Sequence, residues 1–496
     1  MQGEPKFDRS NKCIKCKVEK GNIVIRHAVY CKNCFFPLVT AKFRRCLDPY
    51  INEIPDAPRR KILRAPGNLL VGFSGGLGST VLLDITSRIY FPSGDGSRDD
   101  KKGKAHPSKN RVWDKAYVCY VEVCNAFPEG QMKDRTVDIQ KFFENNDHFE
   151  LLPVRLEDAF DSRWWNKVGE WPSLSTRKAD FSRDELPLFM EALQSNETRG
   201  NPVSLLRAYL SSLPTPTAVQ SAISSFIRLI LIHTANHLQC SHLLLGTSLT
   251  SLSVSLITAV AQGSGSQICE EFFEEWRSPP DMHEPDDRRN KSVKVVRPLR
   301  DIGMKECAAW SYWKNLSVVE REKLPGFSSV RTIGSLTKKF IVGLEKDYPS
   351  TVSTIVRTCA KLTPKEEAHE ICVLCQRPTP LGVLDWKTRI SVRSPPPENC
   401  STSLTAVSEE SRTQVRNQND TPVLSNRLCY ACHTHLTSKP TRSVVSGTSG
   451  VILPQWTNAR LLASTASSGG NDEVWSTSAM SREQMKSVVG DFVLET

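Results

Sequence analysis

The chain has no long hydrophobic run and no hydrophobic segment near its first residue. Among its 496 residues, no apolar stretch approaches the roughly 18 that a membrane span requires, and Met1 to Asn11 are polar. Hydrophobic residues make up 39% of the chain, and its mean hydropathy is −0.34. These values predict a soluble cytoplasmic protein without a membrane anchor, long enough for two or three domains.

A glycine-rich stretch lacks both common nucleotide-binding patterns, because it ends without the Gly-Lys-Ser/Thr of a Walker A loop and is not Gly-x-Gly-x-x-Gly. It follows an apolar run, Leu69–Phe73, and precedes an amphipathic segment that ends near Tyr90. Strand, glycine turn and helix together suit an anion, since the helix N-terminus offers free N–H groups. An ordinary tight turn is the alternative. The candidate phosphate-binding residues are Ser74, Gly75, Gly76, Gly78 and Ser79.

Strand and helix signals alternate after this loop, which predicts an α/β fold with a doubly wound, mostly parallel sheet. Ligands of such sheets bind at the carboxyl ends of the strands, where the loop and a second turn, Gly246–Ser248, should lie. Residues 92–111 are polar and charged and are expected to be a disordered insertion. Further strands are expected at 117–123, 150–156, 242–245 and 293–296, and helices at 133–145, 218–238, 249–262 and 304–315.

Eight of the sixteen cysteines form four Cys-x-x-Cys pairs, a pattern typical of metal or redox sites. The first two pairs are separated by fourteen residues that suit a small hairpin. Four thiolates at this spacing can enclose one tetrahedral Zn²⁺, and a closed shell of four cysteines indicates a structural site. The predicted ligands are Cys13, Cys16, Cys31 and Cys34.

The second two pairs are separated by 53 residues, a long interval for one site, but the Ser/Thr/Pro-rich residues 391–427 can form an excursion between them. His433 and His435 are alternative ligands. The predicted second Zn²⁺ site therefore consists of Cys372, Cys375, Cys429 and Cys432. An iron–sulfur cluster is the alternative occupant of either set.

The positive charge is concentrated near the N-terminus. Residues 1–64 carry 15 Lys/Arg and 6 Asp/Glu, out of a formal net charge of +11 for the chain. Such a basic module favours a polyanionic partner, most simply nucleic acid, with Lys42, Arg44 and Arg45 as the predicted contacts. A solvated basic surface is the alternative. The sequence thus divides into a basic zinc module (1–64), an α/β domain (65–350) and a C-terminal zinc module with long insertions (365–496).

The glycine-rich loop resembles the pyrophosphate loop of N-type ATP pyrophosphatases, Ser-Gly-Gly-x-Asp-Ser, with Gly78 at the acidic position. The order of motifs along the chain resembles the cytoplasmic tRNA 2-thiolation protein 2 family. The segments that carry this resemblance are Cys13–Cys16, Cys31–Phe35, Lys42–Arg44, Phe73–Gly76, Leu245–Ser248, Arg297–Leu299, Cys372–Cys375, Cys429–Cys432 and Asp491–Leu494.

This resemblance implies an adenine nucleotide alpha-hydrolase-like fold and a subunit of the complex that makes 2-thiouridine at the wobble position of tRNAs for Lys, Glu and Gln. It implies a heterodimer with a catalytic paralogue, which adenylates the uridine with ATP. A thiocarboxylated ubiquitin-like carrier supplies the sulfur, and the resemblance extends to conjugation of that carrier to proteins. The partners it implies are therefore the paralogue, the carrier and tRNA.

The sequence departs from the catalytic paralogue at the positions that carry the chemistry. Gly78, Thr250 and Ser251 replace carboxylates that could organise Mg²⁺, and Val296 replaces a catalytic cysteine. Leu213–Thr217 lacks the expected Cys-x-x-Cys pair. We therefore predict a chain without catalytic residues, in which the loop has lost its ATP chemistry. The sequence does not decide whether the loop still binds a nucleotide. The alternatives are an active sulfurtransferase that uses Cys240 or Cys269, and a zinc-dependent nucleic-acid adaptor unrelated to sulfur.

Overall fold

The structure is a computed structural model of the 496-residue chain. It describes residues 12–52, 63–91, 112–144, 148–168, 201–277, 292–319, 324–325, 332–362, 370–379, 424–438, 453–454 and 456–457. The expected insertion at 92–111 and excursion at 391–427 fall outside these ranges, apart from Leu424–Arg427.

The N-terminal part is a short antiparallel hairpin followed by a long helix. Strands β1 (Ile23–Ile25) and β2 (Ala28–Tyr30) pair with Ile23 opposite Tyr30, and the tip residue Arg26 has a φ of 55°. Helix α1 (Lys32–Ile51) begins directly after Cys31 and includes Cys34 in its first turn. The second cysteine pair therefore lies at the start of this helix.

A six-stranded sheet forms the centre of the molecule, in the order β5-β4-β3-β6-β8-β7. All neighbours are parallel except β7, which runs antiparallel to β8 at the edge. The chain winds outward from β3 through β4 to β5 and then returns to the other side of β3 with β6, so the winding direction switches between β3 and β6. The strands are β3 (Asn68–Phe73), β4 (Ala116–Glu122), β5 (Glu150–Arg155), β6 (Cys240–Leu245), β7 (Phe273–Arg277) and β8 (Ser292–Val296).

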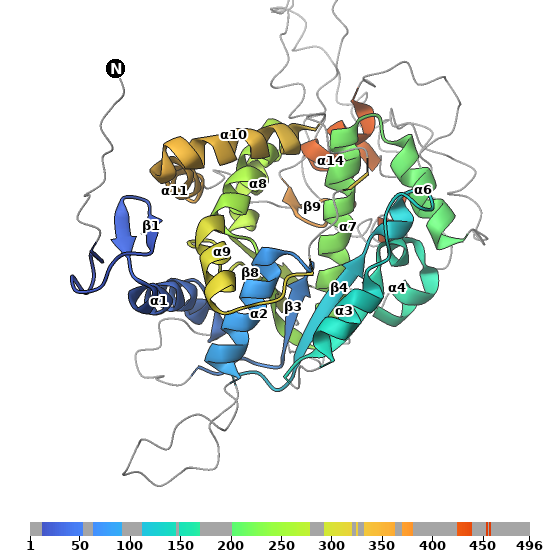
Figure 1. Ribbon diagram of the computed structural model, residues 1–496. Helices are drawn as coiled ribbons and strands as arrows, with labels where there is room; N and C mark the ends of the chain where they lie inside the picture. Colours follow the sequence, from blue (N-terminus) through green and yellow to red (C-terminus); the bar gives the residue numbers. More distant parts are fainter. Residues whose placement is uncertain are drawn as a thin grey trace, which may run out of the picture.

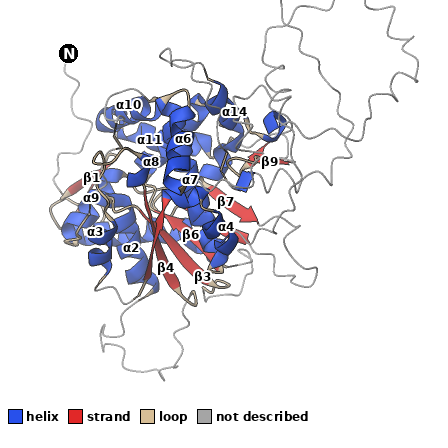
Figure 2. Ribbon diagram, turned by 90° about the vertical axis from the view of Figure 1, so that its right-hand side faces the viewer, coloured by secondary structure: helices blue, strands red, loops and turns tan. Residues whose placement is uncertain are grey.

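Helices cover both faces of this sheet, which confirms the predicted doubly wound α/β class (Figure 1, Figure 2). Alternate residues of β3 separate the two faces: Leu69 and Val71 pack with α1, α2, α3 and α9, whereas Leu70 packs with α7. The helices are α2 (Leu77–Tyr90), α3 (Thr136–Phe143), α4 (Ser162–Val168), α6 (Pro202–Ser212), α7 (Pro216–His237), α8 (Leu249–Ala261) and α9 (Met304–Trp313).

Two further helices, α10 (Ile333–Asp347) and α11 (Pro349–Cys359), pack on α8 around a separate small core. Beyond them, β9 (Glu370–Ile371) and β10 (Pro378–Thr379) form a short antiparallel pair, and α14 (Tyr430–Thr437) lies against α7. The second set of cysteines belongs to the same core as α6 and α7.

Strand β7 differs from the prediction, and the apolar composition of helix α7 requires an explanation. The edge strand β7 was not predicted, since three of the five residues in its sequence Phe-Glu-Glu-Trp-Arg are charged. Within the described residues, α7 is the one helix long and apolar enough to span a membrane, but 67% of its apolar window is buried in the protein. Its apolar residues on both sides are explained by its position between the sheet and the C-terminal segments.

Candidate metal centres

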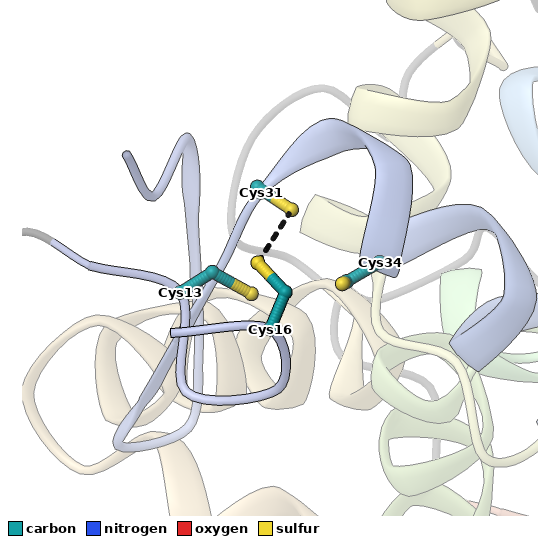
Figure 3. Close-up of side chains that lie close together, drawn as sticks. All are labelled: Cys13, Cys16, Cys31 and Cys34. Carbon is teal, nitrogen blue, oxygen red and sulfur yellow. Dashed lines mark hydrogen bonds between the residues drawn. The ribbon is translucent and has the colours of Figure 1, made fainter. Parts of the chain in front are cut away.

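The first four-cysteine set converges at the N-terminal hairpin, as predicted (Figure 3). All four Sγ atoms lie within 4.8 Å of one another, and the Sγ atoms of Cys16 and Cys31 are 3.8 Å apart. We call this set the N-terminal centre. Cys13 and Cys16 lie on a tight turn before β1, in which the N–H of Lys17 donates to the carbonyl of Cys13 at 2.8 Å.

The other two cysteines of the N-terminal centre lie at the start of helix α1. Cys31 is its N-cap residue, and Cys34 lies in its first turn. Burial raises the pKa of the Cys13 thiol, but hydrogen bonds from the backbone of Cys16, Cys31 and Lys15 outweigh it and lower that pKa to about 6. The turn therefore stabilises a thiolate, which is the form that binds a metal ion.

The second set also converges, although 53 residues separate its two pairs. The four Sγ atoms again lie within 4.8 Å of one another, and those of Cys375 and Cys429 are 3.8 Å apart. We call this set the C-terminal centre. It forms without either alternative histidine ligand, because four cysteines already complete the shell.

The two centres have the same construction. In the C-terminal centre, the N–H of Gln376 donates to the carbonyl of Cys372 at 2.8 Å, and Gln376 has a φ of 54°, close to the 59° of Lys17. Cys429 is the N-cap residue of α14, just as Cys31 is of α1, and its Sγ accepts a hydrogen bond from the N–H of Cys432. Each centre thus joins a tight turn to the start of a helix.

Hydrogen bonds and ion pairs from the sheet body surround the C-terminal centre. Arg228 of α7 donates to the carbonyl of Cys375 at 2.8 Å and is ion-paired with Glu274 of β7. The amide oxygen of Gln376 accepts from the indole of Trp276 at 3.1 Å. Helix α7 and the unpredicted strand β7 therefore both supply polar contacts to this centre.

Burial and neighbouring charges together set the electrostatics around this centre. Burial lowers the pKa of the Arg228 guanidinium to about 9, and it acts against the charged form of Glu271. For Glu271 the nearby cations Arg377 and Arg297 outweigh burial and lower the carboxyl pKa to about 2. A network of paired charges thus lies beside the thiols.

The predicted phosphate loop lies at the carboxyl end of β3, beside the turn that follows β6. The hydroxyl of Ser79 donates to the carbonyl of Gly76 at 2.9 Å and accepts from the N–H of Ser74 at 3.3 Å, so the loop bonds to itself. Gly75 has a φ of 73°, which favours glycine. Ser79 is only 4% exposed.

The loop and the second turn touch through their backbones. A Cβ atom at Gly78 would lie 2.2 Å from the carbonyl oxygen of Gly246, and a Cβ at Gly246 would lie 2.6 Å from the nitrogen of Ser79. Only glycine fits at either position. Because β3 and β6 flank the point where the winding reverses, this backbone contact lies where open α/β sheets bind ligands.

The hydroxyl group of Thr250, which stands where the paralogue pattern has a carboxylate, is occupied by another part of the chain. It donates to the carboxylate of Glu345 on α10 at 2.9 Å and accepts from the N–H of Met304. Val296 is fully buried at the end of β8. Neither position presents a group that could hold a metal or a sulfur atom in transit.

A family model described as Cytoplasmic tRNA 2-thiolation protein 2 matches residues 332–434. A relative of that name from Kluyveromyces lactis is 23% identical over 470 residues, covering 87% of this chain and 94% of the relative. A relative of the same name from Danio rerio is 24% identical, and the match covers 74% of this chain and 72% of the relative. The chain is therefore similar to cytoplasmic tRNA 2-thiolation protein 2 over most of its length.

Among solved structures, the chain is similar to the U34-tRNA thiolase NcsA from Methanococcus maripaludis, solved with its [4Fe-4S] cluster. The sequence identity is 18%, the TM-score is 0.42, and the match covers 71% of this chain and 88% of that one.

Two of the three predicted nucleic-acid contacts are engaged within the protein. Lys42 is ion-paired with Glu306, and its side chain is only 15% exposed. Arg45 pairs with Asp301 at 2.9 Å but stays largely exposed, and Arg44 is exposed. Lys42 therefore attaches α1 to α9, and the prediction of RNA contact rests on the two arginines.

Sequence reasoning missed a carboxylate at the carboxyl end of β4. Glu122 is 1% exposed and accepts hydrogen bonds from the N–H groups of Val123, Cys124 and Arg135 and from the hydroxyl of Tyr120. It lies near Cys124 and Asp134. Its four donors show that it organises the loop after β4; a lone glutamate in the sequence carries no such signal.

Proposed function

We propose that the chain is the non-catalytic subunit of the cytoplasmic complex that introduces 2-thiouridine at position 34 of tRNA Lys, Glu and Gln. It acts as half of a heterodimer with a catalytic paralogue, which takes sulfur from a thiocarboxylated ubiquitin-like carrier. Similarity to the cytoplasmic tRNA 2-thiolation protein 2 relatives supports the role in tRNA thiolation, and the relatives' names support the cytoplasmic location. The observation that carries the non-catalytic assignment is the backbone contact between Gly78 and Gly246.

Uridine adenylation requires Mg²⁺–ATP with its α-phosphate accessible. An Asp at position 78, the position of the motif's carboxylate, would clash with the carbonyl of Gly246. Without a carboxylate at 78, 250 or 251, the loop lacks the carboxylate ligands that usually hold Mg²⁺ beside a nucleotide. Restoring that one side chain would therefore not restore the site, because the backbone occupies its space.

Two cysteines, Cys240 and Cys269, were considered as the reactive thiol of an independent sulfurtransferase. The environment of each argues against that role. Cys240 is 3% exposed at the start of β6, at the opposite end of the strand from the loop, and burial raises its pKa. The thiol of Cys269 donates to the carbonyl of Leu362, and burial raises its pKa too. A thiol with a raised pKa is a poor nucleophile at neutral pH.

The two cysteine centres suit Zn²⁺. Tetrahedral zinc with Zn–S bonds of about 2.3 Å places its sulfur atoms about 3.8 Å apart, which agrees with the Sγ separations in both centres. An iron–sulfur cluster with four irons would hold its thiolates on different irons and therefore further apart. Zinc bound by four cysteines supplies folding free energy, because no ligand position remains for a substrate.

Quantifying 2-thiouridine in tRNA from a strain that lacks the chain and carries one variant at a time tests this function. Deletion of residues 12–34 should abolish thiolation, whereas Ser79→Ala should leave it largely intact. The same change in the paralogue's loop should be severe. Loss of thiolation in Ser79→Ala, with folding and partner binding verified, would show that this loop has a catalytic or obligatory nucleotide role.

Gly78→Asp separates the closed loop from a loop that lost only its carboxylate. We expect lower stability and no gain in ATP binding, measured by thermal unfolding and by titration with Mg²⁺–ATP. ATP–pyrophosphate exchange by the purified wild-type chain would favour an independent sulfurtransferase. Thiolation that persists in the deletion strain would favour the unrelated adaptor.

A further inference from the structure

Helix α10 has two faces of different character. One face packs on the body: Thr337 is 7% exposed, Ile341 is fully buried in the small core with α8, and Glu345 accepts a hydrogen bond from Thr250. Thr332 caps the helix by accepting from the N–H of Ser335. The buried face therefore fixes the orientation of the helix relative to the closed phosphate loop.

The opposite face forms one continuous stripe at positions i, i+3, i+4, i+7 and i+10, which lie on one side of an α-helix. Its apolar members are well exposed, with Leu336 at 56% and Phe340 at 59%. A Cβ atom at Gly343 would meet no atom within 4 Å, so the surface is open there. The stripe consists of Leu336, Lys339, Phe340, Gly343 and Lys346, and we call it the α10 stripe.

The segment that carries the α10 stripe has an excess of positive charge. Residues 332–362 contain five basic and two acidic residues, and one of the acidic residues, Glu345, is engaged with Thr250. All five basic side chains are exposed. They are Lys338, Lys339, Lys346, Arg357 and Lys361. A second exposed aromatic ring, Tyr348 at 65%, follows the helix.

We propose that the α10 stripe binds single-stranded RNA, with Phe340 stacking on an unpaired base and the lysines contacting the adjacent phosphates. Exposed aromatic rings between cations are the combination that binds unstacked bases, whereas an apolar protein partner would not require the positive charge. This inference rests on the proposed function, since the RNA of that function is a tRNA. It adds an RNA contact on the C-terminal half of the chain, whereas the sequence analysis placed the nucleic-acid contacts in residues 1–64.

The test is binding of the full-length chain to tRNA, measured as a function of salt concentration. Phe340→Ala should weaken binding on the order of tenfold, and Phe340→Trp should retain it because the ring still stacks. Lys339→Glu should weaken binding and reduce the slope of log affinity against log salt by about one. Thermal unfolding should be unchanged in each, because these side chains are exposed.

Helix α3 offers matched controls, since Val137 is 57% exposed and Lys141 is exposed on the same helix. Val137→Ala and Lys141→Glu should leave affinity and salt slope unchanged. If the wild-type chain binds tRNA and all α10 variants bind it equally well, the RNA assignment of the stripe is wrong while the proposed function stands. Should those variants instead lose co-purification with the partner subunit, the stripe is a protein interface. If the wild-type chain fails to bind tRNA alone and with its partner, both proposals fail.

Discussion

The N-terminal and C-terminal centres share a tight turn and a helix start, yet they lie in different surroundings. In the N-terminal centre, Cys16 and Cys34 are half-buried and the hairpin packs at the edge of the molecule. In the C-terminal centre, all four cysteines are at most 7% exposed and lie in the core with α6 and α7. The same metal-binding unit can therefore serve as a separate module or as part of a core.

The contacts around each centre explain the difference. Arg228, Gln376 and Trp456 link the C-terminal centre to the body; the indole of Trp456 donates to the carbonyl of Leu374 at 3.0 Å. The N-terminal centre is attached mainly through α1, where Phe35 packs on Trp313 with ring centroids 4.9 Å apart. Loss of metal should consequently propagate in one case and stay local in the other.

The largest effect is expected from Cys375→Ser in the C-terminal centre. Metal binding contributes on the order of 10 kcal/mol in small zinc modules, comparable to the roughly 5–15 kcal/mol stability of a typical protein. We expect a large fall in unfolding temperature and in soluble yield, measured with zinc content. Cys307→Ser, at a fully buried cysteine outside both centres, is the control. Similar losses in both variants would mean that burial of a thiol, rather than the metal, accounts for the effect.

Arg228→Met should follow, because it leaves the carboxylate of Glu274 buried without its partner. Removing one member of a buried pair costs about 3–5 kcal/mol, so the free energy of unfolding should fall by that order. Denaturant unfolding gives the value. Arg88→Met should cost less than about 1 kcal/mol, because the Arg88 side chain is 51% exposed and its partner Asp84 keeps the hydrogen bond from Trp310. Equal losses would contradict the importance of the core setting.

His242 connects α1 to the sheet and should make stability depend on pH. Its Nε2 is 2.7 Å from the carbonyl of Tyr50, and the indole of Trp113 faces its Nδ1 at 3.3 Å. Burial lowers the pKa of His242 to about 4, below its ordinary value of 6.5. The unfolded chain thus binds the proton more readily, so this stability is fully present above about pH 6.5 and decreases as the pH falls toward 4.

The contribution of His242 should amount to about 3 kcal/mol, from roughly 1.4 kcal/mol per pKa unit. Denaturant unfolding between pH 4 and 7 measures it, and His242→Gln should flatten that part of the profile. His237→Gln, on the half-buried end of α7, is the control variant. An unchanged profile in His242→Gln would assign the pH dependence to other groups.

The smallest effect on the body is expected from Cys13→Ser. Residues 12–34 should unfold locally and zinc content should fall by one, while the free energy of unfolding of the body changes by less than about 1 kcal/mol. Helix α1 stays attached because Tyr50 stacks on Phe273 at 4.5 Å and Lys42 pairs with Glu306. Hydrogen exchange locates the unfolding. Loss of body stability as large as in Cys375→Ser would remove the distinction between the two centres.

Features that depend on neighbouring residues in the chain could be predicted from the sequence. The strand before Ser74, the helix after it and the Cys-x-x-Cys pairs follow from local periodicity and spacing, and the structure has β3, α2 and both cysteine sets where they were expected. The alternation of strands and helices could also be predicted locally, since each strand and helix carries its own pattern of apolar residues.

Tertiary structure decided what depends on residues far apart. Only the packed chain shows that Gly246 fills the space beside Gly78 and that Lys42 forms an ion pair with Glu306. It also shows that two cysteine pairs separated by 53 residues come together as one four-cysteine set. The charged strand β7 pairs because β8 offers a free edge. Such contacts leave no periodicity in the sequence, because each joins segments whose distance is set by the fold as a whole.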